Sequence, residues 1–295
     1  MGRTVRHSSA KTGDYMTGAV LLTGATGFVG RQVLKVLGEC GARVRVVVRE
    51  GTRSRLARQE AIERIITTQD LFGEHESWWA EACQGIDTVI HAAWYAEPGQ
   101  YLQSDKNIDC LVGTLKLAKG ATRSKVRRFI GIGTCFEYDL AEGMLSVTTP
   151  LLALTPYAAA KAATFMMLSQ WFPLQGIEFA WCRLFYLYGE GEDTRRLVPY
   201  LRSKLAAGES AELTSGNQVR DFLDVSTAAR MIVDTAFSDD QGPVNICSGI
   251  PTTVRQLAEQ IADEYDARDL LKFGARPDNF IDPPCVVGIR HKSIL

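Results

Sequence analysis

The sequence has little that would place the protein in a membrane or on a nucleic acid. No apolar run approaches the ~18 residues that a membrane-spanning helix needs. The 33 basic and 34 acidic residues nearly cancel, so no charge excess marks a surface for nucleic acid or anionic lipid. Residues 1–16 contain no apolar stretch, so they are not a secretory signal, and we expect a disordered leader or a tag there. These absences predict a globular protein with neither nucleic acid nor membrane among its partners.

Cysteine and histidine lack the spacing that two common kinds of site require. The seven cysteines are scattered without a C-x-x-C pair, and such a set fits a reducing compartment better than a disulfide framework. The four histidines lie apart from one another and from any group of cysteines. We therefore expect a cytoplasmic protein with no metal site.

Apolar strand-like segments alternate with helical patterns up to about residue 184. Strands separated by helices form βαβ units, which predicts an α/β fold of Rossmann type, a doubly wound parallel sheet with helices on both faces. After residue 185 the alternation loosens, and we expect a Rossmann domain at 17–184 and a smaller C-terminal α/β substrate-binding lobe at 185–295, with an interleaved boundary. Strands are expected at 19–24, 43–49, 64–70, 87–93, 127–134 and 177–184, and helices at 28–38, 107–122 and 158–172.

The first junction between a strand and a helix is rich in glycine and reads "TGATGFVG". Glycines at such a junction let the backbone approach a pyrophosphate, and the helix N-terminus presents unpaired N–H groups to it. The spacing departs from the usual G-x-G-x-x-G, but the position after the first strand favours a dinucleotide site over a simple tight turn. The residues expected to contact the cofactor here are Gly24, Thr26, Gly27, Phe28, Val29 and Gly30.

The end of the second strand bears on which dinucleotide binds. An acid usually stands there when NAD is bound, because it accepts a hydrogen bond from the ribose 2′-hydroxyl. Here the position is taken by Arg49, which suits the 2′-phosphate of NADP. Glu50 is adjacent and could serve NAD instead, so NAD remains possible while NADPH is favoured.

A tyrosine and a lysine are placed for proton transfer in "YAAAK". Tyr157 and Lys161 are four residues apart, so they share one face of a helix, and Pro156 suits the first turn of that helix. An ammonium close to a phenol favours the phenolate and lets the tyrosine exchange a proton. Surface pairs at this spacing are common, but downstream of a dinucleotide junction the pair predicts a site of hydride transfer.

Together these stretches resemble the extended short-chain dehydrogenase/reductase family in its epimerase/dehydratase branch, from residue 19 to about 280. The resemblance implies that Thr134 is a third catalytic residue and that Asp70, Leu71, Ala92, Ala93 and Leu184 contact the cofactor, as do Tyr157 and Lys161. It also implies a nucleoside-diphosphate sugar as substrate and a homodimer formed through helices 107–122 and 157–172. The side chains expected at the substrate are Tyr95, Cys135, Phe136, Tyr186, Arg220 and Arg276.

Departures from the family pattern reduce the number of reactions that we expect of this chain. The Asp-Glu pair that follows the threonine in 4,6-dehydratases is Cys135-Phe136 here, and Glu137 comes one residue too late, so elimination is disfavoured. The family's N-x-x-G-T motif has Cys110 in place of asparagine, with Asn107 as a candidate replacement, and an expected asparagine is Tyr186.

Two redox reactions and one binding role remain. The resemblance is narrower to bacterial reductases of the CDP-abequose synthase type, which implies NADPH-dependent reduction of the 4-keto group of a nucleoside-diphosphate 4-keto-6-deoxyhexose. In that reaction Tyr157 would donate the proton and Thr134 would hydrogen-bond the same oxygen. An NAD-dependent nucleotide-sugar 4-epimerase is the alternative, and a non-catalytic NAD(P)-binding sensor is the second. The nucleotide, the sugar and the product stereochemistry stay open.

Overall fold

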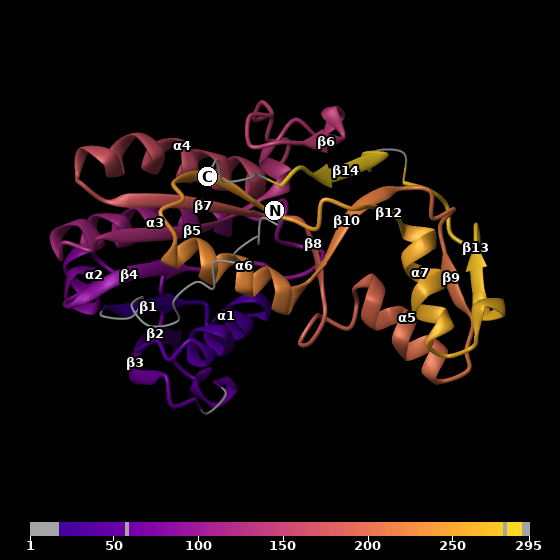
Figure 1. The fold of residues 1–295 in the computed structure, drawn as a ribbon, viewed down its shortest axis with the longest axis horizontal. Coiled ribbons are helices and arrows are strands. Elements are labelled where there is room, and N and C mark those ends of the chain that lie inside the picture. Colours follow the sequence, from indigo (N-terminus) through magenta and orange to yellow (C-terminus); the bar gives the residue numbers. More distant parts are fainter. Residues whose placement is uncertain (1–17, 57–58, 280–281, 291–295) are drawn as a thin grey trace, which may run out of the picture.

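The computed structural model describes residues 18–56, 59–279 and 282–290, and the predicted leader at 1–16 lies outside these ranges. Its larger part is one parallel sheet of seven strands (Figure 1). The strand segments are rich in valine, isoleucine and leucine and are mostly buried, as expected for a sheet covered on both faces. The strands are β1 (Ala19–Thr23), β2 (Val44–Arg49), β3 (Ile62–Thr68), β4 (Ile86–His91), β5 (Arg128–Thr134), β7 (Glu178–Leu184) and β11 (Gly242–Ile246).

The strand order shows where the sheet opens for a ligand. The order is β11-β7-β5-β4-β1-β2-β3, so the chain winds outward in both directions from the pair β1 and β4. In such sheets a crevice forms at the carboxyl ends of the strands where the winding direction changes. The predicted Rossmann-type sheet is confirmed, including the six expected strands. The seventh strand, β11, was not expected, since its segment was assigned to the small lobe.

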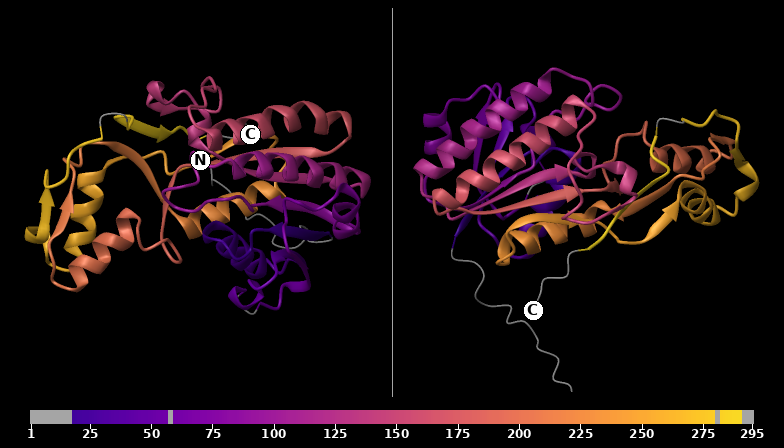
Figure 2. Two further views of the ribbon diagram at one scale, coloured as in Figure 1. Left: turned by 180° about the vertical axis from the view of Figure 1, so that it is seen from behind. Right: turned by 90° about the horizontal axis from the view of Figure 1, so that it is seen from above.

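Helices cover both faces of the sheet (Figure 2). The helices α1 and α6 pack against one face, and α2, α3 and α4 pack against the other, where α3 and α4 lie side by side. Buried aliphatic residues dominate the first core, and the second adds aromatic rings such as Trp79, Phe129 and Trp181. The helices are α1 (Phe28–Glu39), α2 (Glu76–Ala82), α3 (Lys106–Arg123), α4 (Pro156–Leu174) and α6 (Val225–Phe237).

The smaller lobe is built mostly from residues after β7 and has its own apolar core between α5, α7 and a two-stranded sheet. The chain crosses between the lobes several times, because α6 and β11 return to the large sheet, while β6 from the first half pairs with β14. The elements are β6 (Met144–Leu145), β8 (Tyr186–Tyr188), α5 (Leu197–Ala206), β9 (Ala211–Leu213), β10 (Val219–Asp224), β12 (Pro251–Thr253), α7 (Val254–Asp263), β13 (Leu271–Phe273) and β14 (Cys285–Gly288).

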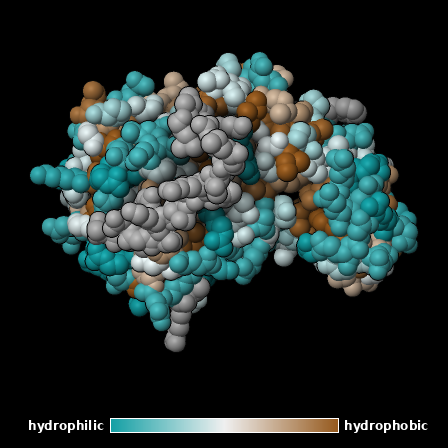
Figure 3. Space-filling view, in the orientation of Figure 1, coloured by the Kyte–Doolittle hydropathy of each residue, from teal (hydrophilic) through white to brown (hydrophobic). Residues whose placement is uncertain are grey.

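The surface differs between the two lobes. Figure 3 shows hydrophilic residues over the outer part of the small lobe, and hydrophobic residues gathered where the lobes meet. Within the described ranges, no helix has the length and apolar character to cross a membrane.

Candidate active site

The glycine junction after β1 is shaped for close approach of a ligand to the backbone. Gly24 has a φ of +75°, and a Cβ atom there would lie 2.7 Å from the Ala92 carbonyl carbon. A Cβ at Gly30 would lie 2.0 Å from the Gly24 carbonyl oxygen, so α1 can begin against the turn only with glycine. Gly27 caps α1 without a side-chain hydrogen bond, and the first turn holds no acid. The N–H groups at this helix end are therefore free to meet an anion.

A cavity of about 670 Å³ opens at this junction, at the carboxyl ends of β1, β2 and β4. It has the place and the lining that a dinucleotide requires. Phe28 and Val29 follow in the first turn of α1. The predicted residues that line the cavity are Gly24, Thr26, Gly27, Arg49, Asp70, Leu71, Ala92, Ala93 and Tyr95.

The outer wall of this cavity carries the two residues expected at the adenosine end. Arg49 is exposed at the last position of β2 and lines the cavity, with Glu50 directly beside it. Asp70 lies at the turn after β3, where its carboxylate accepts the Phe72 N–H at 3.1 Å. Both the guanidinium for a 2′-phosphate and an acid for a 2′-hydroxyl are therefore present, so the choice between NADP and NAD stays a prediction.

A buried histidine, His91, links the elements behind the cavity. The Thr114 hydroxyl donates to the Cys110 carbonyl at 2.7 Å, so it accepts from His91 Nε2 at 2.9 Å. The other ring nitrogen, Nδ1, then accepts the Thr23 hydroxyl at 2.8 Å, and Thr23 in turn accepts the Ala93 N–H. Burial lowers the pKa of His91 to about 3, with the Lys161 charge adding to the effect. His91 is thus a neutral structural link between β1, β4 and α3.

Thr134 ends β5 and begins a tight 3₁₀ turn, Cys135–Glu137. Its N–H donates to the Glu137 carboxylate at 2.8 Å, and its hydroxyl accepts the Phe136 N–H at 3.3 Å. Glu137 is fully buried and also accepts from Arg183 at 2.8 Å and from the Trp181 indole. The carboxylate is therefore part of the scaffold behind Thr134.

Tyr157 lies in the first turn of α4, which Thr155 caps and Pro156 opens. Its backbone N–H donates to the Leu102 carbonyl at 3.1 Å, and its ring packs edge-on against Tyr101 with centroids 4.8 Å apart. Burial raises the pKa of the Tyr157 phenol, Tyr101 adds to the rise, and a hydrogen bond with Thr134 opposes it. The phenol therefore lies near Thr134 and is protonated at neutral pH, as tyrosine ordinarily is.

Lys161 is buried one turn further along α4, and its Nζ donates to the Ile132 carbonyl at 2.6 Å. Burial lowers its pKa to about 7, and the Glu137 carboxylate opposes that change. Nζ lies 6.0 Å from the Tyr157 ring centroid but only 3.7 Å from that of Trp94. The expected lowering of the tyrosine pKa by Lys161 is therefore not seen in this structure, because the lysine turns toward Ile132 and Trp94.

Four of the residues predicted at the substrate lie together between the two lobes. Phe136 meets Tyr186 with ring centroids 6.2 Å apart, and the Arg220 guanidinium lies 5.2 Å from the Tyr186 ring. Cys135 is buried in the same cluster, next to Thr134. Leu184 is the register partner of Thr134 across β5 and β7. These side chains form a continuous path from Thr134 to the small lobe.

Three of the predicted substrate residues have contacts that the sequence did not indicate. Arg220 is buried and pairs with Asp282 at 2.6 Å, so its charge is already neutralised by this chain. Arg276 is exposed and lies over the Tyr200 ring at 5.0 Å, with Glu212 at 4.0 Å. Among the described residues its polar contacts stay within the small lobe, so the structure does not bring Arg276 to the catalytic residues. Tyr95 lines the dinucleotide cavity rather than the Tyr186 cluster.

This geometry agrees with the comparison to protein families. The model of the NAD dependent epimerase/dehydratase family matches residues 20–247, which include the glycine junction, Thr134, Tyr157 and Lys161. The chain belongs to this family. The resemblance inferred from the sequence motifs is thereby confirmed.

Individual relatives of the family carry several reactions. The chain is 22% identical to dTDP-6-deoxy-L-talose 4-dehydrogenase (NAD(+)) of Aggregatibacter actinomycetemcomitans, over 92% of this chain and 99% of the relative. It is 24% identical to CDP-abequose synthase of Salmonella muenchen, over 87% and 84%. A solved UDP-N-acetylglucosamine 4-epimerase from Methanobrevibacter ruminantium M1 superposes with a TM-score of 0.80 at 22% identity, over 92% and 89%. The last likeness confirms the fold.

Sequence reasoning missed three side chains that contact the predicted catalytic residues or their turn. Trp94 lines the cavity and covers Lys161, while Glu137 and Arg183 anchor the turn that holds Thr134. A tryptophan directly after the predicted strand 87–93 would have needed a spatial partner to be noticed. The pair Glu137 and Arg183 was within reach, since both flank motifs that were already singled out.

Proposed function

We propose that this chain reduces the 4-keto group of a nucleoside-diphosphate 4-keto-6-deoxyhexose with NADPH. The observation that carries the proposal is the placement of Tyr157 in the first turn of α4, near Thr134, which is followed by Cys135 and Phe136. A protonated phenol suits donation to an alkoxide, and the turn offers no free carboxylate for elimination because Glu137 is held by Arg183. The relative named dTDP-6-deoxy-L-talose 4-dehydrogenase (NAD(+)) supports redox chemistry at carbon 4, with NAD as its named cofactor.

The residues of the chain divide the work at the reacting carbon. The cavity lined by Gly24, Ala92 and Ala93 would hold NADPH, which would supply the hydride. Tyr157 gives its proton to the oxygen at carbon 4, and Thr134 hydrogen-bonds that oxygen as charge develops on it. Lys161 would contact the nicotinamide ribose. The small-lobe path through Phe136 and Tyr186 would hold the sugar, with Arg220 available to the diphosphate once Asp282 is displaced.

The cofactor and the alternatives can be tested in one set of assays. Purified protein is given a panel of nucleoside-diphosphate 4-keto-6-deoxyhexoses with NADPH or NADH, and absorbance at the reduced nicotinamide band is followed. We expect NADPH consumption with at least one sugar, and a loss of about 10²–10⁴-fold in Tyr157→Phe, which keeps the ring but removes the proton. Thr134→Val provides a second test of the same oxygen.

The other outcomes assign other functions. Interconversion of unreduced sugars by protein that carries bound NAD would contradict the proposal and identify a 4-epimerase, which the similar fold of the UDP-N-acetylglucosamine 4-epimerase makes the second candidate. Dinucleotide binding without turnover of any sugar would indicate a sensor.

The expected homodimer also remains a proposal. Apolar side chains are exposed on the two helices predicted to form its interface, Ile108 and Val112 on α3, and Met166 and Met167 on α4. We expect sedimentation of a dimer, and of a monomer for a Met167→Lys variant, because a charge on this face would oppose its burial. A variant that still sediments as a dimer would place the interface elsewhere.

A further inference from the structure

Trp94 lies between the dinucleotide cavity and the buried end of Lys161. It follows β4 directly after Ala92 and Ala93, lines the cavity, and presents its ring face 3.7 Å from Lys161 Nζ. We propose that Trp94 is a positioning residue that holds the Lys161 ammonium in place for hydride transfer through a cation–π contact. This inference rests on the proposed function, since it gives Lys161 the role of contacting the nicotinamide ribose.

Lys161 has few other means of keeping its charge in this position. It is 4% exposed, and its one hydrogen bond in the described part of the chain goes to the Ile132 carbonyl. The nearby Glu137 carboxylate raises the Lys161 pKa, but it is hydrogen-bonded to Arg183 and Trp181 rather than to Lys161. Burying an ammonium with so little compensation is costly, and an indole face is the aromatic surface that offsets this cost best.

Trp94 is itself held rigidly, which a positioning residue requires. Its indole N–H donates to Asn107 Oδ1 at 2.9 Å, and the Asn107 amide donates to the carbonyls of Tyr101 and Ser104 at 2.6 and 2.9 Å. The ring also makes edge contacts with Phe72 and Tyr157, with centroids 6.3 and 6.5 Å apart. Asn107 is fully buried, so the hydrogen-bond partner of the Trp94 indole is itself held within the fold.

The same contacts explain the departure from the family's N-x-x-G-T motif. Cys110 stands where the motif has asparagine, and its Sγ accepts the Tyr95 N–H at 3.4 Å. Asn107, one turn earlier on α3, instead anchors the indole of Trp94. In this chain α3 thus reaches Lys161 through the aromatic ring of Trp94, and both Trp94 and Tyr95 are tied to that helix.

Two substitutions separate the π face from simple filling of space. Trp94→Leu keeps an apolar side chain without a ring, and Trp94→Phe keeps a smaller ring. Trp78→Leu is the matched control, because Trp78 packs on Trp79 in α2 rather than on Lys161. We expect kcat for sugar reduction to fall about 10- to 30-fold in Trp94→Leu, the size of a desolvated cation–π contact. It should fall less in Trp94→Phe, which keeps a weaker π face without the indole N–H, and be retained in the control Trp78→Leu.

A spectroscopic measurement tests the contact without any sugar. In protein labelled with ¹³C at lysine Cε, we expect the Lys161 methylene protons to be shifted upfield by the ring current of Trp94. This shift should vanish in Trp94→Leu and survive in part in Trp94→Phe. An unshifted Lys161 signal in the wild-type protein would overturn the inference.

The two measurements also distinguish the inference from the proposed function. If no sugar is reduced by the wild-type chain but the ring-current shift is present, the reductase proposal fails while the contact stands. If Trp94→Leu and Trp94→Phe raise KM for the dinucleotide equally and leave kcat unchanged, Trp94 is only a wall of the cavity and its positioning role is wrong.

Discussion

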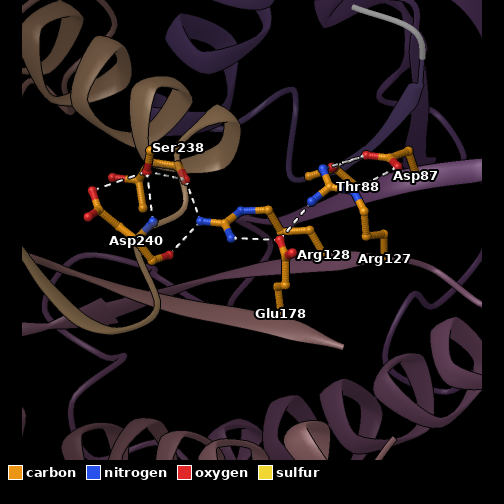
Figure 4. A network of polar contacts seen from close by, with 8 residues as sticks. Asp87, Thr88, Arg127, Arg128, Glu178, Ser238 and Asp240 are labelled. Atoms are coloured by element: carbon orange, nitrogen blue, oxygen red, sulfur yellow. Dashed lines mark hydrogen bonds and ion pairs between the residues drawn. The ribbon is translucent and has the colours of Figure 1, made fainter. Parts of the chain in front are cut away.

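Two buried arginines on the neighbouring strands β5 and β7 lie at opposite ends of the sheet and are held in different ways. Arg128, at the amino end, meets Glu178 at 3.0 Å and donates to the carbonyls of Thr235 and Asp240 (Figure 4). Glu178 is 35% exposed and shares its charge with Arg127. This network ties the strands to the end of α6, and water can reach its carboxylate.

At the carboxyl end the pair is sealed from water. Arg183 and Glu137 are 1% and 0% exposed, and the guanidinium also lies 4.5 Å from the rings of Tyr138 and Phe165. Glu137 holds the Thr134 N–H, and Arg183 is the register partner of Gly133. The comparison shows that the same pair of residue types joins strands at one end of the sheet and at the other end anchors the turn of Thr134, the predicted catalytic hydroxyl.

The largest expected effect comes from breaking the sealed pair. Glu137→Gln leaves the Arg183 guanidinium buried without a negative partner, and we expect the free energy of unfolding to fall by about 3–5 kcal/mol, measured by urea denaturation. In the double variant Glu137→Met/Arg183→Met much of this loss should return, while sugar reduction should stay low because the Thr134 N–H has lost its acceptor. A loss below about 1 kcal/mol in the single variant would show that the pair is not the anchor proposed here.

A smaller effect is expected at the amino end. Arg128→Met removes the donors to two backbone carbonyls but leaves Glu178 partly hydrated and still paired with Arg127. We expect the free energy of unfolding to fall by about 1–3 kcal/mol, with kcat unchanged within error. A loss of sugar reduction as large as that expected for Glu137→Met/Arg183→Met would erase the distinction between the two ends of the sheet.

A dependence of stability on pH is expected at Lys161. Burial lowers its folded-state pKa to about 7, while the unfolded chain keeps the ordinary value of 10.5. Between these pH values the unfolded chain binds more protons, so wild-type stability gains from this group as pH rises, by at most about 1.4 kcal/mol per pH unit. Lys161→Met should therefore be stabilised most, relative to wild type, below pH 7.

Denaturation series at pH 6, 8 and 10 would measure that dependence. We expect the advantage of Lys161→Met over wild type to shrink with rising pH and to vanish near 10.5. A difference that is constant with pH would mean that Lys161 keeps an unshifted pKa in the folded protein.

Local pattern was enough to predict most of the large sheet and the positions of its functional turns. Buried parallel strands are continuous apolar runs, and a glycine junction or a Y-x-x-x-K helix is legible within ten residues of chain. For that reason the six expected strands, the glycine junction and the start of α4 lie where the motifs indicated. The seventh strand escaped prediction because Gly242–Ile246 is short and includes Pro243, which is tolerated at the edge of a sheet.

The sequence by itself therefore determined the class of fold, the place of the glycine junction and the residue types available for proton transfer. Only the tertiary structure decided what surrounds those residues. The partners of Lys161, Glu137 and Arg220 come from segments tens of residues away, and for Lys161 burial rather than spacing lowers the pKa. A motif identifies the residue types of an active site, and the packing around those residues determines their partners and their exposure to water.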